Sequence, residues 1–145
     1  MVDVRSLSTP RTEESPAPGA PKILAAEDDA GTRLLYRAIL QADYDLAFAS
    51  DFETALERAQ SATFDLVLVD ISLRGTRNGV DLLKELRTEP DYTDVPLIAI
   101  TAHAMPGDQN RFLTAGFDAY VAKPFTRQTL AKTIQRYLPD HHAAP

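Results

Sequence analysis

Cysteine is absent from the 145 residues of this chain. The protein can therefore form no disulfide, no thiolate nucleophile and no cysteine-type zinc site. No apolar run approaches the roughly 20 residues of a membrane-spanning helix. The first residues also lack the apolar segment of a secretory signal. These absences together favour a cytoplasmic protein.

Basic residues are fewer than acidic residues in this chain. Fifteen Lys and Arg residues stand against 21 Asp and Glu residues, which gives a net charge of -6 at pH 7. This excess of negative charge argues against a nucleic-acid partner and against an anionic membrane surface. The remaining composition, 44% hydrophobic and 25% charged, is that of a soluble globular protein. The length fits one domain with a full hydrophobic core.

The chain divides into three regions by composition. Residues 1–21 can bury little apolar surface and are predicted to form a disordered or weakly ordered tail; their prolines are Pro10, Pro16, Pro18 and Pro21. Residues 22–138 alternate between strand and helix patterns and are predicted to form the folded domain. Residues 139–145 form a short polar tail, in which His141 and His142 are expected to be solvated.

Short apolar runs alternate with segments of helical periodicity. The patterns predict strands over residues 23–26, 44–49, 66–70, 97–101 and 119–122. They predict helices over residues 30–42, 79–88, 106–115 and 126–138, and another that opens with a capping box at Ser50–Glu53. In the first helix, the predicted buried face holds Leu34, Leu35, Ala38 and Ile39. Five strands alternating with five helices indicate an α/β fold, with a parallel sheet covered on both faces.

Polar residues follow the predicted strands at their carboxyl ends. Glu27 and Asp28 follow the first strand, Asp70 ends the third, Thr101 ends the fourth and Lys123 follows the fifth. All strands of a parallel sheet end at the same edge, where open α/β sheets bind their ligands. Each residue taken singly is more typical of a cap or a turn. Their joint placement favours a shared site.

The acidic members of this set suit a metal ion. Carboxylates that lie close together repel one another unless a cation intervenes. Mg²⁺ prefers oxygen ligands, and Asp28 and Asp70 could bind it directly, with Glu27 acting directly or through water. A carboxylate beside Mg²⁺ can act as a nucleophile toward a phosphoryl group. Lys123 could supply a positive charge and Thr101 a hydroxyl donor for the phosphoryl oxygens.

Four segments carry a resemblance to a known family. Residues 22–29, 65–73, 97–102 and 120–125 resemble the marker segments of response-regulator receiver domains of two-component signalling. The resemblance runs from about Lys22 to about Leu138, and it is closest to stand-alone receivers of the chemotaxis type. It implies a flavodoxin-like, doubly wound (βα)5 three-layer sandwich, with a parallel five-stranded sheet in the order 2-1-3-4-5.

The resemblance also implies roles for the residues at the strand ends. Asp70 matches the phospho-acceptor. Glu27 and Asp28 match the acidic pair that holds Mg²⁺, together with Asp70 and the backbone carbonyl of Ser72. Sensor histidine kinases or histidine phosphotransfer proteins are the implied phosphodonor partners.

Further roles concern the phosphoryl group and its consequences. Thr101 and Lys123 match residues that contact the phosphoryl group, and Tyr120 matches the switch aromatic that moves as Thr101 engages the phosphate. Ser72 and His103 match positions that tune the phosphoryl lifetime. The face around Phe112, Tyr120 and Arg127 is the predicted partner surface. The active form is expected to be a monomer or a phosphorylation-dependent dimer.

The loop after Asp70 departs from the usual family pattern. Arg74 stands where the family usually has proline, and the distance from Asp70 to Gly79 is about one residue longer than is common. We therefore expect the loop from Ser72 to Gly79 to differ in shape from that of other receivers. The Lys123-Pro124 peptide bond is often cis in the family.

Two other functions of α/β proteins require residues that this chain lacks. A phosphatase of the dehalogenase type would need Asp two residues after Asp70, where this chain has Ser72. A dinucleotide-binding module would need a Gly-x-Gly-x-x-Gly loop where Glu27, Asp28 and Asp29 stand. The sequence therefore predicts a signalling module that catalyses only its own phosphorylation and dephosphorylation, and that signals by protein contact. The alternatives are a phosphate sink or relay without conformational output, or a receiver-like module that has lost phosphorylation.

Overall fold

The computed structural model describes residues 16, 18–102 and 105–138. The strands are β1 (Lys22–Ala26), β2 (Asp45–Ala49), β3 (Leu66–Asp70), β4 (Leu97–Thr101) and β5 (Ala119–Ala122). The helices are α3 (Ala30–Leu40), α4 (Phe52–Ser61), α5 (Gly79–Arg87), the 3-10 helix η1 (Pro90–Tyr92), α6 (Asp108–Ala115) and α7 (Arg127–Tyr137). Most of the predicted tail at 1–21 and all of that at 139–145 lie outside the described residues.

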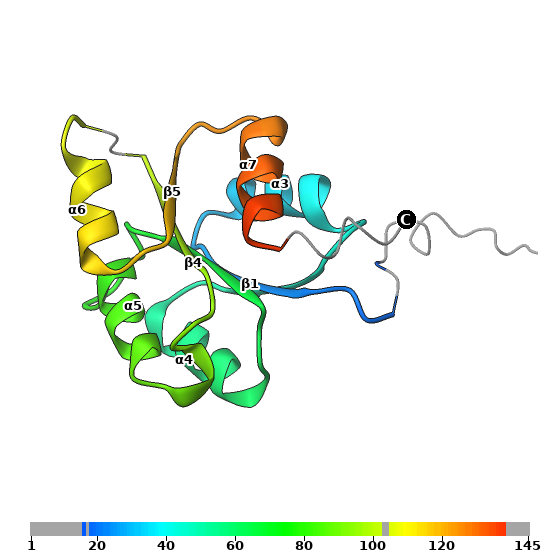
Figure 1. Ribbon diagram of the computed structural model, residues 1–145, viewed down its shortest axis with the longest axis horizontal. Helices are drawn as coiled ribbons and strands as arrows, with labels where there is room; N and C mark the ends of the chain where they lie inside the picture. Colours follow the sequence, from blue (N-terminus) through cyan, green and yellow to red (C-terminus); the bar gives the residue numbers. More distant parts are fainter. Residues whose placement is uncertain (1–15, 17, 103–104, 139–145) are drawn as a thin grey trace, which may run out of the picture.

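The strands form one parallel sheet in the order β2-β1-β3-β4-β5, as predicted. Helices α3 and α7 cover one face, and α4, α5 and α6 cover the other (Figure 1). The predicted three-layer α/β fold is therefore confirmed. No helix in the described part of the chain is both long enough and apolar enough to span a bilayer.

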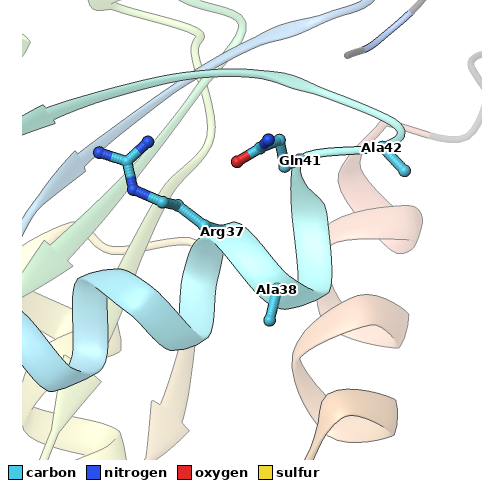
Figure 2. A pocket seen from close by; sticks show the side chains of 4 residues that line it. All are labelled: Arg37, Ala38, Gln41 and Ala42. Carbon is cyan, nitrogen blue, oxygen red and sulfur yellow. The ribbon is translucent and has the colours of Figure 1, made fainter. Parts of the chain in front are cut away.

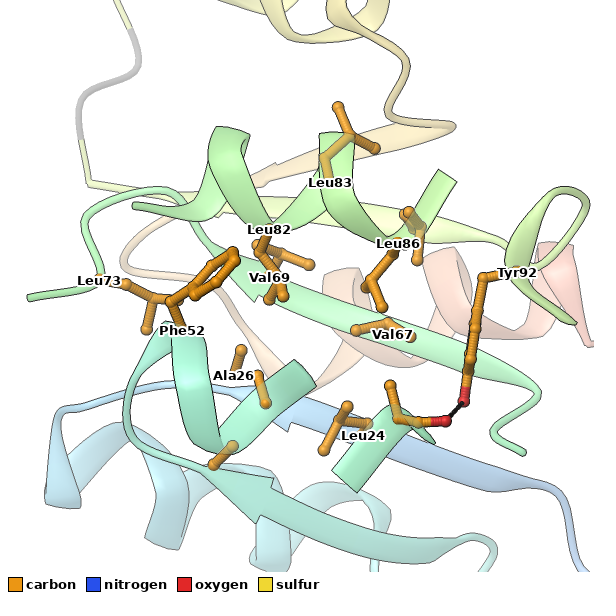
Figure 3. Packing of buried hydrophobic residues seen from close by; sticks show 14 of the residues in the cluster. Leu24, Ala26, Phe52, Val67, Val69, Leu73, Leu82, Leu83, Leu86 and Tyr92 are labelled. Atoms are coloured by element: carbon orange, nitrogen blue, oxygen red, sulfur yellow. Dashed lines mark hydrogen bonds between the residues drawn. The ribbon is translucent and has the colours of Figure 1, made fainter. Parts of the chain in front are cut away.

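The central strand β3 is buried along its whole length. Leu66 and Leu68 point into the cluster beneath α3 and α7, whereas Val67 and Val69 point into the cluster beneath α4 and α5. Figure 3 shows the second cluster, in which leucines of α5 and residues of α4 converge on β3. An apolar residue at every position is what a strand buried on both faces requires. This packing fixes the end of β3, and so the position of Asp70.

Helix α3 turns a different face inward from the one predicted. Leu34 is 66% exposed and Leu35 is 42% exposed, and Ala38 also faces solvent. The buried residues are Tyr36, Ile39 and Leu40, so only Ile39 of the predicted face is correct. Apolar residues lie on both the buried and the exposed face of the helix, and periodicity alone does not choose between the two faces.

Two helix starts also differ from the prediction. Asp51, and not Ser50, caps α4, because its carboxylate accepts a hydrogen bond of 2.8 Å from the backbone N–H of Thr54. The helix predicted from Pro106 begins at Asp108 instead. Both Ser and Asp are good caps, so the composition alone could not separate the two positions before α4.

Helix η1 was not predicted, and it buries Tyr92. The Tyr92 hydroxyl accepts a hydrogen bond of 3.1 Å from the N–H of Phe64 and lies 2.9 Å from the carbonyl oxygens of Ala59 and Ala62. Figure 3 shows this side chain at the edge of the cluster. The hydroxyl therefore ties η1 to the end of α4 and to the start of β3.

Replacing Tyr92 by Phe should lower the free energy of unfolding by about 1–2 kcal/mol, because buried backbone groups lose their partner. The measurement is urea unfolding followed by circular dichroism. Tyr137→Phe is the matched control, since the Tyr137 hydroxyl donates one bond of 2.8 Å to the carbonyl of Asp118 near the surface. Equal losses in the two variants would contradict the role given to Tyr92.

Candidate functional site

Three carboxylates meet at the carboxyl edge of the sheet. Glu27 and Asp28 follow β1, and Asp70 ends the neighbouring strand β3. Each offers an oxygen that lies within 4.8 Å of those of the other two. Glu27 and Asp70 are buried, with 0% and 4% exposure, and Asp28 is half-buried. The structure therefore brings together the acidic residues that the sequence predicted to converge.

Lys123 joins these acids from the loop after β5. Its Nζ lies 3.2 Å from both carboxylate oxygens of Glu27 and 3.5 Å from Oδ2 of Asp70. The Lys123 backbone N–H donates a bond of 2.7 Å to the carbonyl of Thr101, which ties the loop to the end of β4. The Lys123-Pro124 bond is cis, as expected. One cation thus bridges two of the three carboxylates.

The loop after Asp70 is held by the acids themselves. The Ser72 N–H donates a bond of 2.9 Å to Asp70 Oδ1. Both the backbone N–H and the Nε of Arg74 lie 3.2 Å from Asp28 Oδ2. Asn78 ends the loop as the cap of α5, in a capping box that the sequence analysis did not identify. The loop expected to be unusual is therefore anchored at the acidic cluster through Arg74.

The other predicted residues differ in how the structure places them. Thr101 is fully buried at the end of β4, in register with Ala122 of β5, and so lies at the same edge as Asp70. Tyr120 is half-buried in β5, and its ring packs 6.2 Å from that of Phe112 on α6. His103 lies outside the described residues. The predicted switch aromatic therefore contacts α6, on the face predicted to meet partners.

Two residues near the acids were missed by the sequence analysis. Arg33 donates a bond of 2.8 Å to the carbonyl of Glu27. Tyr36 is buried, and burial, followed by the charges of Glu27 and Asp70, raises its pKa well above the usual range. Its ring stacks on Phe125 at 5.7 Å with an angle of 4° between the planes. Tyr36 could have been identified from the sequence only if the buried face of α3 had been predicted correctly.

The surroundings of Glu27 disfavour its charged form. Burial is the largest cause that raises its pKa to about 7, and hydrogen bonding and repulsion with Asp70 add to it, while Lys123 opposes them. Burial disfavours the charge on Lys123, but Asp70 and Glu27 outweigh this effect and raise the pKa of Lys123. Glu27 Oε1 receives no well-directed hydrogen bond within the described part of the chain. Lys123 alone therefore does not balance the charges of Glu27 and Asp70.

A divalent metal ion fits this donor set. The available ligands are carboxylate oxygens, which Mg²⁺ prefers. A cation bound between Asp28 and Asp70 would offset the repulsion from Asp70, which adds to burial in raising the pKa of Glu27. The incompletely bonded Glu27 Oε1 offers a further oxygen for a ligand or for a water molecule on the ion.

The raised pKa of Glu27 predicts a pH-dependent stability in metal-free protein. The folded-state pKa of about 7 lies above the ordinary value of 4.5, so the folded protein binds this proton more tightly than the unfolded chain. The stabilisation is fully present below pH 4.5 and is lost as the pH rises through about 7. Glu27→Gln cannot ionise, and it should be more stable than the wild type at pH 8, by up to about 3 kcal/mol, with no advantage at pH 4.5.

The measurement is urea unfolding in a chelating buffer at both pH values. Glu57→Gln, a substitution of an exposed glutamate on α4, is the control and should follow the wild type at both. If the free energy of unfolding changed with pH by the same amount in the wild type and in Glu27→Gln, ionisation of the buried Glu27 would not destabilise the fold, and the prediction would be wrong.

A separate hollow of about 260 Å³ lies at the C-terminal end of α3. Arg37, Ala38, Gln41 and Ala42 line it (Figure 2). It contains no carboxylate and none of the residues predicted for the site. The acidic cluster, and not this hollow, is therefore the candidate site.

Comparison with known proteins agrees with the fold. A sequence profile of the response regulator receiver domain matches residues 23–135. The polar-differentiation response regulator DivK of Brucella anthropi is 32% identical over 119 residues, which cover 81% of this chain and 96% of DivK. The sensor histidine kinase GacS of Pseudomonas protegens is 30% identical over 139 residues, or 90% of this chain. This chain spans only 15% of that kinase.

A solved structure is similar in fold. The receiver domain of the sensor histidine kinase PA1611 from Pseudomonas aeruginosa superposes with a TM-score of 0.76 at 31% identity. The match covers 83% of this chain and 99% of that one. Its crystal structure has a magnesium ion coordinated in the active site cleft. The acidic cluster described above is compatible with such an ion.

Proposed function

This chain belongs to the response regulator receiver domain family of two-component signalling, and we propose that its Asp70 accepts a phosphoryl group from a histidine kinase or a histidine phosphotransfer protein. One observation carries the proposal: three carboxylates lie within 4.8 Å of one another, and Lys123 reaches two of them. Asp70 ends a strand buried on both faces, so its position is fixed.

The proposed reaction is a displacement at phosphorus. A carboxylate oxygen of Asp70 forms a P–O bond while the P–N bond to the donor histidine breaks, and the imidazole leaves after taking a proton. Lys123, with Nζ already 3.5 Å from Asp70 Oδ2, would balance charge on the phosphoryl oxygens. The Thr101 hydroxyl is the proposed second donor. Water later hydrolyses the acyl phosphate and returns Asp70 to its carboxylate form.

Mg²⁺ is the proposed cofactor. Asp28 and Asp70 would hold it, with the Ser72 carbonyl as a further ligand and Glu27 acting directly or through water. When bound, the ion would neutralise charge on the phosphoryl group in the transition state. Because Asp70 also binds the Ser72 N–H, its carboxylate is already oriented in the absence of an incoming donor.

The proposed output is a phosphorylation-dependent protein contact. Thr101 would engage the phosphoryl group, and Tyr120 would change its packing against Phe112. The face around Phe112, Tyr120 and Arg127 is the proposed partner surface. Ser72 and His103 are the proposed determinants of phosphoryl lifetime. The proposed action is in the cytoplasm, as a monomer or as a dimer formed on phosphorylation.

A phosphate relay without conformational output is the second candidate. It is favoured by the similarity of this chain both to the sensor kinase GacS and to the receiver domain of the sensor kinase PA1611. A pull-down with unmodified protein and with a stable phosphoryl mimic, beryllium fluoride, separates the two. A partner that binds only the mimic-loaded form supports switching, and equal capture of both forms supports the relay.

The central test uses a small acyl phosphate such as acetyl phosphate. The protein is incubated with this donor and Mg²⁺, and its intact mass is followed over time. We expect a single phosphoryl adduct that forms with Mg²⁺, fails to form with a chelator and disappears on standing. An unmodified protein, even after incubation with a cognate histidine kinase, would overturn the proposal.

A further inference from the structure

We propose that Arg74 competes with Mg²⁺ for Asp28 and so weakens the affinity of this site for the metal. The inference rests on the proposed function, since it concerns the same metal site. Arg74 has no role in the proposed phosphoryl transfer. Arg74 stands in the loop where this chain departs from the usual family pattern.

Arg74 contacts Asp28 directly. The Nε of Arg74 and its backbone N–H both lie 3.2 Å from the same carboxylate oxygen, Asp28 Oδ2. Asp28 belongs to the group of acids whose oxygens lie within 4.8 Å of one another. An oxygen that accepts two N–H groups has less electron density to offer a metal ion. The guanidinium is also permanently charged, so it repels the incoming cation at any physiological pH.

The positive groups at the site are divided among the acids. Lys123 lies beside Glu27 and Asp70, whereas Arg74 is the cation that contacts Asp28. In the metal-free protein, each of the three acids therefore has a positive group of the chain beside it. A metal ion and the Arg74 side chain draw on the negative charge of the same carboxylate, and an ion that binds Asp28 Oδ2 displaces the Arg74 side chain.

The Arg74 side chain can leave Asp28 at little cost in free energy. Its side chain is 88% exposed, while that of Asp28 is only 15% exposed. Exposed ion pairs are weak, because water solvates the charged groups well when they separate. The backbone N–H can keep its bond to Asp28 while the side chain turns into solvent. Arg74 therefore works as a displaceable competitor and not as a fixed part of the site.

Arg77 offers a matched control on the same loop. Its guanidinium lies 3.9 Å from the centre of the Phe52 ring and pairs with Glu85 at 3.6 Å. These contacts hold it on α4 and α5, and neither contact involves a carboxylate of the site. Removing Arg77 changes the net charge by the same amount as removing Arg74, so it separates a direct competition from a general charge effect.

The test measures Mg²⁺ binding directly, with no phosphodonor present. Backbone amide NMR shifts are followed as Mg²⁺ is added to the metal-free wild type, to Arg74→Gln and to Arg77→Gln. We expect Arg74→Gln to bind Mg²⁺ about two- to fivefold more tightly, as the loss of an exposed ion pair implies. Arg77→Gln should match the wild type. An unchanged or weaker affinity in Arg74→Gln, or an equal gain in Arg77→Gln, overturns the inference.

A second readout separates competition from a merely structural role. Without metal, Arg74→Gln should unfold at a slightly lower temperature, because Asp28 loses its cation. With saturating Mg²⁺, its gain in unfolding temperature should exceed that of the wild type. A residue that only supported the loop would not enlarge the gain. If neither the wild type nor the variants bind Mg²⁺, the metal site of the proposed function fails with the inference; if all bind equally, only the inference fails.

Discussion

Asp70→Asn should carry no phosphoryl group after incubation with a small acyl phosphate and Mg²⁺, under conditions that modify the wild type. An amide oxygen is a far weaker nucleophile than a carboxylate, and an amide also brings no charge to hold the metal. Both proposed roles of Asp70 are lost at once. We therefore expect complete loss of the adduct by intact mass, and not a partial decrease.

The variant should nevertheless fold, which makes its loss of function interpretable. The amide oxygen introduced by Asp70→Asn can accept the bond that the Ser72 N–H now donates to Asp70 Oδ1. The substitution removes the pairing of Asp70 Oδ2 with Lys123 at 3.5 Å and the charge repulsion between Asp70 and Glu27, and Lys123 still has Glu27 beside it. Circular dichroism and urea unfolding check this directly.

The matched control is Asp65→Asn, the same substitution just before the start of β3. Asp65 lies at the opposite edge of the sheet, where its carboxylate accepts a bond of 2.8 Å from the N–H of Lys22. This variant should be phosphorylated like the wild type. An adduct of undiminished yield on Asp70→Asn would place the acceptor elsewhere, and peptide mapping would then locate it.

The sheet could be predicted from the sequence because its strands are buried. β3 and β4 are apolar at nearly every position, a pattern with few alternatives for segments of this length. The convergence of Glu27, Asp70 and Lys123 followed from that, since parallel strands end at one edge. The strand pattern alone therefore predicts that these residues lie together.

The helix faces and the loops depended on information that is not local. Helix α3 has apolar residues on two stripes, and contact with the sheet, beside the stacking of Tyr36 on Phe125, selects the one that turns inward. From the sequence, Arg74 could be recognised only as a departure from the proline that is usual in the family at this position. Its contact with Asp28 spans 46 positions in the sequence and depends on how the loop folds back. No periodicity encodes such a contact.

Gly79 packs against the end of the strand that carries Asp70, and of the substitutions proposed here its replacement should have the largest effect on the free energy of unfolding. Gly79 is the first residue of α5, and it packs directly against the end of β3. A Cβ built there would lie 2.4 Å from the carbonyl oxygen of Asp70, 2.9 Å from Cα of Ile71 and 3.0 Å from the carbonyl carbon of Asp70. These atoms belong to the backbone, so no side-chain rotation can relieve the contact.

Gly79→Ala should therefore lower the free energy of unfolding by about 3 kcal/mol or more, since α5 and the end of β3 must move apart. The control is Gly31→Ala within α3, where the nearest atom to the new Cβ is Asp29 Oδ2 at 3.3 Å; its change should stay below about 1 kcal/mol. Urea unfolding measures both. The same shift displaces Asp70, so the part of Gly79→Ala that remains folded should be phosphorylated more slowly than the wild type. If Gly79→Ala were as stable as the wild type, close packing of α5 on β3 would not limit the residue at this position. If a destabilised Gly79→Ala were phosphorylated at the wild-type rate, the reaction would tolerate displacement of the Asp70 backbone.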